Sequence, residues 1–314
     1  MVELSIVIVS WNVRDLLRQC LRSISSLSSS LSSEIIVVDN GSADGSVEMV
    51  QAEFPSVRVI TNVDNRGFPT AINQGIGVAQ GRYIFLLNPD TEVVDDALGT
   101  MVTFADVHSD VGIIGPQLLD PDGSVQSSRR RFPTLATAFF ESTWLTHYAP
   151  RSLLRHYQML DTPDNATQDV DWVDGAAFMA RRKAVEQVGL MDEGFFMYSE
   201  ELDWCRRFRE TGWRVVYLPA ARIVHHRGKS SEQVVAASHI HFQTSKVRYF
   251  RKYHGRTVAE MLRLFLLGNY AWQLGLEGVK WLVGHRRPLR AARIVAYRQV
   301  LRSGLRRDDG GGDG

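Results

Sequence analysis

The first half of the chain alternates short apolar runs with segments in which apolar residues recur every three or four positions. The consecutive apolar runs predict buried strands at residues 4–10, 34–38, 57–60 and 83–87. The periodic segments between them predict helices at residues 12–27, 46–54 and 69–80. Apolar strands that alternate with helices are typical of a mostly parallel central sheet covered by helices on both faces. The pattern therefore predicts an α/β fold.

The second half of the chain is less regular. The turn sequence Asp120-Pro121-Asp122-Gly123 separates two predicted strands, at residues 111–119 and 125–132. Further strands are predicted at 172–180 and 213–217, and further helices at 183–188 and 200–211. From Lys246 onward the pattern is only helical. We expect one domain built from two halves, followed by a helical extension and a disordered tail, at residues 1–115, 116–250, 251–307 and 308–314.

Charge, cysteine content and the lack of targeting patterns indicate the partners and the compartment of the protein. The 36 basic and 35 acidic residues nearly cancel, and we expect no nucleic-acid partner. Cys20 and Cys205 each lie in a predicted helix and are expected to be buried thiols in a reducing compartment. The chain enters a strand at once, without the pattern of a signal peptide. The longest uncharged stretch of the tail, residues 264–276, is too short for a spanning helix. We therefore expect a cytoplasmic protein.

Two predicted strands end in an acid, Asp39 and Asp90. In a doubly wound sheet, ligands bind outside the carboxyl ends of the strands, so these acids are expected in one crevice. The alternative is that each is a turn former, which suits the Asp-Asn-Gly-Ser context of Asp39. No glycine-rich phosphate loop follows the first strand. If the crevice binds a diphosphate, Mg²⁺ or Mn²⁺ held by Asp90, beside the rigid Pro89, is the natural candidate to neutralise it.

A second group of acids begins the predicted helix at residues 200–211. Glu201 shares a helix face with Trp204, Cys205 and Phe208, so it is expected to point inward at the positive end of the helix. That position suits a general base. The alternative is that the glutamates only complement the helix dipole, while Asp203 pairs with Arg207 one turn later.

Two adjacent histidines, His225 and His226, follow a strand-like run and precede Arg227-Gly228-Lys229-Ser230. A histidine at this place is able to complete the coordination of a cation or contact a phosphate. A structural role is the alternative.

These segments resemble family-2 glycosyltransferases, in particular the rhamnosyltransferase-like branch of bacterial cell-envelope assembly. The resemblance covers roughly residues 3–250 and depends on six motifs in the family's order: SIVIVSWN, VVDNGSADGS, NRGFPTAINQGI, GRYIFLLNPDTEV, GAAFMARRKAVEQVGLMDEGFFMYSEELDWCRR and LPAARIVHHRGKSS. It implies the nucleotide-sugar-dependent GT-A fold and an inverting mechanism.

The resemblance also implies roles for single residues. Asp39 matches the acid that contacts the nucleotide base or ribose, and Ser10 and Asn12 line the same pocket. Asn88-Pro89-Asp90 matches the metal motif with its first acid replaced by Asn, so Asp90 is the expected ligand. Glu201 matches the catalytic base, and His225 the histidine of the metal–diphosphate site. We also assign Asn65, Asn88 and Glu200 to the donor site.

Three further residues are assigned to the site, and two of them, Arg129 and Trp172, have an alternative role. Arg129, with Arg131 on one face of a predicted strand, either assists the diphosphate or forms a solvated basic face. Trp172 lies where the family forms the floor of the sugar and acceptor pockets, and either stacks on a sugar or packs in the core. Asp174 is placed to hydrogen-bond a sugar hydroxyl.

The implied reaction needs no covalent intermediate. Glu201 takes a proton from an acceptor hydroxyl that attacks the anomeric carbon opposite the leaving diphosphate. By resemblance, the donor is dTDP-L-rhamnose and the acceptor is a cell-envelope glycan or polyprenyl-linked glycan. The rival interpretations are a sugar-phosphate nucleotidyltransferase and a non-catalytic nucleotide-sugar-binding protein.

The helical C-terminal region adds a second predicted binding surface. Residues 246–307 contain many Arg and Lys but only two acids, Glu260 and Glu277. Apolar and basic helices of this kind lie at anionic membrane surfaces, which predicts peripheral association with the inner face of the cytoplasmic membrane. A helix hairpin docked on the catalytic domain, or a dimer contact, is the alternative.

Overall fold

The structure is a computed structural model that describes residues 2–25, 31–141, 143–226 and 235–306. The chain forms two compact units. The sheet unit consists of Met1–Phe132, Arg155–Phe196 and Glu200–Ser230, and the helical unit of Pro133–Leu154, Met197–Ser199 and Ser231–Gly314. The predicted division at residues 115 and 250 stays a prediction. The predicted disordered tail, 308–314, lies outside the described residues.

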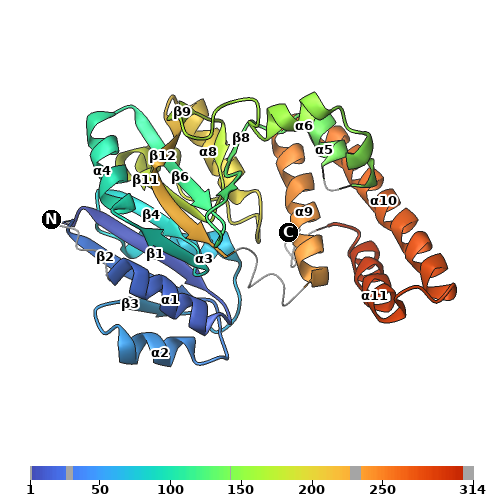
Figure 1. Cartoon of the computed structure of the whole chain (residues 1–314), viewed down its shortest axis with the longest axis horizontal. Helices are drawn as coiled ribbons and strands as arrows, with labels where there is room; N and C mark the ends of the chain where they lie inside the picture. The colour runs from blue at the N-terminus through green and yellow to red at the C-terminus, as the bar shows by residue number, and fades with distance from the viewer. Residues whose placement is uncertain (1, 26–30, 142, 227–234, 307–314) are drawn as a thin grey trace, which may run out of the picture. The chain divides into compact units, whose positions relative to one another are not determined.

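One large sheet forms the centre of the sheet unit (Figure 1). Its strands lie in the order β3 (Arg58–Thr61), β2 (Ser33–Asp39), β1 (Leu4–Ser10), β4 (Tyr83–Leu87), β11 (Ala177–Arg181), β6 (Val111–Leu119), β12 (Arg214–His225) and β5 (Thr91–Val94). The sheet is parallel from β3 to β4, as predicted, and mixed beyond β4. β11 is antiparallel to both β4 and β6, while β12 is parallel to β6. Therefore β1, β2, β4 and β12 all end at the same edge of the sheet.

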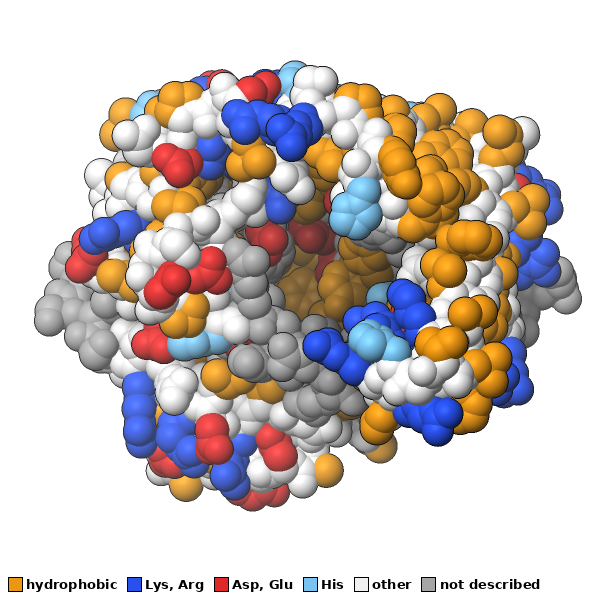
Figure 2. All heavy atoms as spheres, turned by 45° about the vertical axis from the view of Figure 1, so that its right-hand side comes forward, with side chains coloured by type: hydrophobic (Ala, Val, Ile, Leu, Met, Phe, Trp, Pro, Cys, Tyr) orange, Lys and Arg blue, Asp and Glu red, His pale blue; other side chains and the backbone are white. Residues whose placement is uncertain are grey.

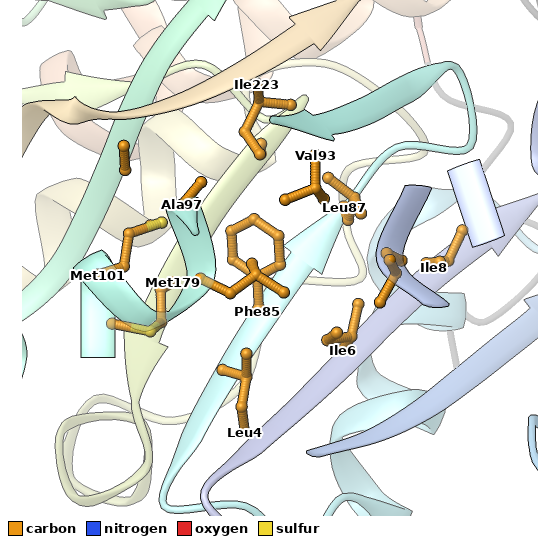
Figure 3. Packing of buried hydrophobic residues seen from close by; sticks show 14 of the residues in the cluster. Leu4, Ile6, Ile8, Phe85, Leu87, Val93, Ala97, Met101, Met179 and Ile223 are labelled. Carbon is orange, nitrogen blue, oxygen red and sulfur yellow. The ribbon is translucent and has the colours of Figure 1, made fainter. Parts of the chain in front are cut away.

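Helices cover both faces of this sheet. On one face lie α1 (Arg14–Ser25), α2 (Ser46–Glu53) and α4 (Ala97–Val107); on the other lie α3 (Phe68–Val78), α7 (Arg182–Val188) and α8 (Glu200–Glu210). Leu4, Ile6 and Ile8 of β1 pack with the first set around Phe85 (Figure 3). The alternate residues of β1 pack with the second set. Because both faces are buried, the strand is apolar at consecutive positions.

The predicted strands of the second half differ in their bounds. The strand predicted at 125–132 is split into β7 (Val125–Gln126), which pairs with β6, and β8 (Arg129–Arg130), which pairs with β10 (Trp172–Val173). β9 (Gln168–Asp169) pairs with β12. The strand predicted at 172–180 is also wrong as one element, because the chain turns between β10 and β11. The strand predicted at 213–217 continues to His225 through a register shift around Pro219.

The helical unit contains α5 (Leu135–Phe140), a 3₁₀ helix at Trp144–Tyr148, α9 (Val235–His254), α10 (Arg256–Leu282) and α11 (Arg287–Ser303). Helix α6 (Arg151–Tyr157) crosses the boundary between the two units. The buried pair Glu277–Arg290, at 2.8 Å, links α10 to α11. Among the helices that the structure describes, none combines the length and the apolar character that a membrane crossing requires.

Candidate active site

The carboxyl ends of β1 and β2 place Ser10 beside Asp39 in the parallel register. Asp39 is buried, and one of its oxygens, Oδ2, accepts a hydrogen bond from the Ser42 amide at 2.8 Å. Its other oxygen, Oδ1, and the Ser10 hydroxyl are buried and have no partner among the described residues. The alternative prediction, that Asp39 only forms a turn, thus accounts for one of its two carboxylate oxygens. Buried polar atoms without partners at a ligand-binding edge are suited to receive ligand donors.

Two other predicted donor-site residues hold the loops around this edge. Asn12 has a left-handed backbone, with φ 53°, and its Oδ1 accepts from the Ala43 amide at 2.8 Å. Asn65 Oδ1 accepts from the Gly67 amide and from the side-chain amide of Asn40. Asn40 was missed by sequence reasoning, although a buried amide directly after an apolar strand is a usable signal. It also donates to the Gly67 carbonyl at 3.1 Å.

Asp90 lies in the short turn between β4 and β5. The Asn88 amide donates to the Ala176 carbonyl at 2.8 Å, and the Asn88 carbonyl accepts from the Thr91 hydroxyl at 2.7 Å. The Asp90 carbonyl accepts from the His226 amide. The turn is thereby fixed on both sides, and the Asp90 side chain is only 7% exposed. A rigid, nearly buried carboxylate results at the tip of the strand.

The two histidines have different neighbours. His225 Nε2 lies 3.5 Å from Asp90 Oδ1. His226 Nε2 lies 2.7 Å from Glu92 Oε1 and is therefore engaged elsewhere. The structure thus brings His225, rather than His226, to the predicted metal ligand.

Asp90 and His225 present an oxygen and a nitrogen to one point, which fits a divalent cation. Within the described part of the chain, no group of three or more His, Cys, Asp or Glu side chains is able to hold a metal ion. Mg²⁺ and similar ions commonly take one or two protein ligands and fill the other positions with water and substrate phosphates. The pair fits such a site better than a structural metal cage.

Glu201 lies in the first turn of α8 and reaches the same edge, because it packs against Gly175, whose neighbour Ala176 accepts a hydrogen bond from the Asn88 amide at the end of β4. Its carboxylate is partly buried, and Oε2 has no partner among the described residues. Burial, together with the charge of Asp174, raises the pKa of Glu201 to about 7. A Cβ added at Gly175 would lie 3.5 Å from the Glu201 carboxyl carbon, so the loop before β11 packs directly against this group. A carboxylate with a pKa near 7 suits a general base.

The neighbouring acids are less suited to that role. Burial, and then the charge of Glu201, raise the pKa of Glu200 well above its usual value, which disfavours the ionised form that a general base needs. Asp203 is fully buried and pairs with Arg207 at 2.9 Å, which confirms the predicted pairing one turn apart. Just before the helix, Tyr198 and Ser199 both have positive φ, 70° and 65°. Such backbone strain is typical of functional sites.

The other predicted site residues are held by the fold. Arg129 is only 3% exposed, donates to the Thr162 carbonyl at 2.9 Å and lies over the Tyr217 ring. A solvated face is therefore wrong for this residue, and we leave Arg129 out of the proposed site. The Trp172 indole donates a hydrogen bond to the Arg131 carbonyl. The side chain packs against the core, as the core-packing alternative predicted. Asp174 Oδ1 accepts from the Ala176 amide at 3.0 Å.

The chain matches the family model described as glycosyl transferase family 2 over residues 5–189 and belongs to that family. It is therefore a glycosyltransferase, and neither a nucleotidyltransferase nor a non-catalytic binding protein. A relative from Mycobacterium tuberculosis, N-acetylglucosaminyl-diphospho-decaprenol L-rhamnosyltransferase, is 30% identical over 208 residues, 63% of this chain and 67% of that protein. Rhamnosyltransferase WbbL of Escherichia coli is 27% identical over 161 residues, 47% of this chain and 53% of that protein.

Solved structures confirm the GT-A fold. Mannosyltransferase PcManGT from Pyrobaculum calidifontis, in complex with GDP-Man and Mn²⁺, matches with a TM-score of 0.58 at 15% identity, covering 96% of this chain and 84% of that chain. GalNAc-T7 with UDP, GalNAc and Mn²⁺ also matches with a TM-score of 0.58, at 16% identity. That match covers 80% of this chain and 48% of GalNAc-T7.

Proposed function

We propose that this glycosyltransferase is inverting and cation-dependent, with a nucleoside-diphosphate sugar as its donor. The observation that carries the proposal is the common edge of the sheet. Three features lie at the carboxyl ends of strands in one unit. They are the Asp90–His225 pair, the oxygens of Ser10 and Asp39 that have no partner among the described residues, and the first turn of α8. Ligands of open α/β sheets bind at this edge.

Each part of the site has a distinct task. Ser10 and Asp39 receive hydrogen bonds from the nucleoside, since their free buried oxygens would otherwise stay unsatisfied. Asp90 and His225 hold Mg²⁺ or Mn²⁺. The bound cation supplies neutralisation of the charge that develops on the leaving diphosphate.

Glu201 is the base. The acceptor hydroxyl loses its proton to a Glu201 carboxylate oxygen while its own oxygen attacks the anomeric carbon. The bond from that carbon to the diphosphate oxygen breaks on the opposite face, so the configuration inverts. The carboxylate is suited to this step because its raised pKa, about 7, leaves it a stronger base than an exposed glutamate.

We assign the donor as dTDP-L-rhamnose and the acceptor as a polyprenyl-linked glycan of the cell envelope. Two relatives support this, since both are named as rhamnosyltransferases and one is named for a diphospho-decaprenol acceptor.

A thermal-shift panel of nucleotide sugars tests the donor. With dTDP-L-rhamnose and Mn²⁺, we expect Tm to rise by about 5 °C, because ligand at a hundred times its Kd stabilises the folded state by about 2.7 kcal/mol. UDP-N-acetylglucosamine and GDP-mannose should give smaller shifts, and EDTA should reduce all of them. A larger shift with another donor would exclude rhamnose. No shift with any nucleoside diphosphate, with or without Mn²⁺, would exclude the nucleotide site.

We also propose that the helical unit binds an anionic membrane surface. Apolar side chains gather over the C-terminal helices (Figure 2). The exposed ones on α10 include Leu264, Trp272 and Val279, and no charged residue occurs between residues 264 and 276. The only acid between residues 261 and 306, Glu277, is buried against Arg290. The exposed charges there are therefore all basic, which complements anionic lipid.

Vesicle sedimentation tests this surface. The full chain should bind phosphatidylglycerol vesicles and lose at least tenfold of that binding when Trp272 and Val279 are both replaced by Glu, because each change puts a charge into the apolar face. Val107→Glu, which changes an exposed residue at the end of α4 in the sheet unit, is the matched control and should bind normally. Equal binding to phosphatidylcholine, or a stable dimer that buries these residues instead, would contradict the proposal.

A further inference from the structure

A buried amide, Gln126, lies next to the proposed cation site. It is the last residue of β7, and it opposes Leu118 in the antiparallel pairing with β6. β12 also pairs with β6, at Leu119, so the Gln126 side chain spans from β7 to the end of β12. The side chain is only 4% exposed, and all of its hydrogen bonds are therefore made within the protein.

Three oxygens fix the orientation of this amide. The Gln126 nitrogen lies 2.7 Å from the His225 carbonyl, 2.9 Å from Asp120 Oδ1 and 3.2 Å from the Leu119 carbonyl. Carbonyl and carboxylate oxygens only accept hydrogen bonds, so the NH₂ group has to face them. The flipped amide would place its oxygen against three other oxygens.

The amide orientation in turn fixes His225. Gln126 Oε1 lies 3.1 Å from His225 Nδ1. Because this oxygen only accepts, Nδ1 has to carry the hydrogen. In the neutral imidazole, Nε2 then has a lone pair, and it presents that lone pair 3.5 Å from Asp90 Oδ1. A divalent cation bound by both atoms would use this lone pair and the carboxylate together.

We propose that Gln126 is a positioning residue that keeps His225 in the tautomer able to bind a divalent cation together with Asp90. The inference rests on the proposed function. Without Gln126, neutral His225 is free to carry its hydrogen on Nε2 and donate it to Asp90. That hydrogen bond would occupy both ligands and close the site. Partners of this kind, behind a metal ligand, typically change metal affinity by 10–100-fold.

The test compares Gln126→Met with Gln117→Met in the full chain. Both changes remove the same side-chain amide, but that of Gln117, on β6, donates to the Tyr217 hydroxyl and the Asp164 carbonyl rather than holding His225. With dTDP as the nucleotide probe, Mn²⁺ affinity measured by electron paramagnetic resonance should fall about 10–100-fold in Gln126→Met. It should stay within twofold of the wild type in Gln117→Met.

Nuclear magnetic resonance gives a second, activity-free readout. In protein with isotope-labelled histidine and without metal, the His225 ring, identified by its loss in His225→Ala, should show the Nδ1–H tautomer. A His225 ring with hydrogen on Nε2, or unchanged Mn²⁺ affinity in Gln126→Met, would overturn the inference. If Gln126→Met does not fold, the tautomer of the wild type still decides. Failure of the wild type to bind Mn²⁺ would instead overturn the proposed function.

Discussion

Replacing Glu201 by Gln is expected to lower kcat by about 10³-fold while leaving the affinity for donor within twofold. The reason is that Gln has nearly the same shape but does not accept a proton, and general-base catalysis contributes about 10²–10⁴-fold. Glu210→Gln, at the exposed end of the same helix, is the control and should retain full activity. Initial rates and donor-induced thermal shifts, measured on both variants, separate turnover from binding. Retained turnover in Glu201→Gln would mean that another group is the base.

The pH dependence follows from the pKa of Glu201, which burial and Asp174 raise from the unperturbed 4.5 to about 7. The wild-type rate should therefore rise with pH up to and just beyond 7, whereas the residual rate of Glu201→Gln should not show this step.

The same shift has an effect on stability. Between about pH 4.5 and 7 the folded state still holds a proton that the unfolded state has lost, so stability decreases as pH rises through this window. Glu201→Gln should then be more stable than the wild type by about 1–3 kcal/mol at pH 8 and equal to it near pH 4. Denaturant melts at both pH values measure the difference. A less stable variant at pH 8 would contradict a site that disfavours the ionised Glu201 carboxylate.

The parallel half of the sheet could be predicted from the sequence, because strands that are buried on both faces have consecutive apolar residues. Asp39 and Asp90 end or follow apolar runs, so the rule that ligands bind at strand ends was enough to group them, whereas Ser10 was assigned from the family resemblance. The pairing of Asp203 with Arg207 was also predictable, since it depends only on helical spacing. These are local consequences of chain geometry.

The remaining features depend on contacts between distant segments. Neither propensity nor spacing indicates that β11 runs antiparallel between β4 and β6, although this strand sets the direction of β12 and therefore the position of His225. Gln126 lies 99 positions from His225 and was not predicted. The burial of Arg129 was not predictable, because the carbonyl groups that accept its hydrogen bonds belong to an irregular segment near residue 160. Without those partners, an arginine in a strand is expected on a solvated face. The choice between His225 and His226 likewise required the register of β5 against β12.

Replacing Asp90 by Asn should remove most of the cation dependence of the enzyme. Asn keeps the size and the turn but lacks the charge, and it is a far poorer ligand for Mg²⁺ or Mn²⁺ than a carboxylate. We expect kcat/KM to fall by about 10³-fold, which corresponds to the several kcal/mol that a bound cation contributes at a leaving phosphate. The additional thermal shift that Mn²⁺ gives with dTDP should also disappear.

The matched control is Asp95→Asn, a few residues further along the chain. Asp95 has a left-handed backbone, with φ 51°, which Asn tolerates, and its exposed side chain pairs with Arg222 rather than with His225. This variant should keep both kcat/KM and the Mn²⁺ effect. If Asp90→Asn kept full activity in EDTA, the diphosphate charge would have to be neutralised by protein side chains, and the acid at the tip of β4 would serve only the turn. A loss shared equally by both variants would point to the fold of this segment. A loss confined to Asp90→Asn leaves cation binding as the function of its carboxylate.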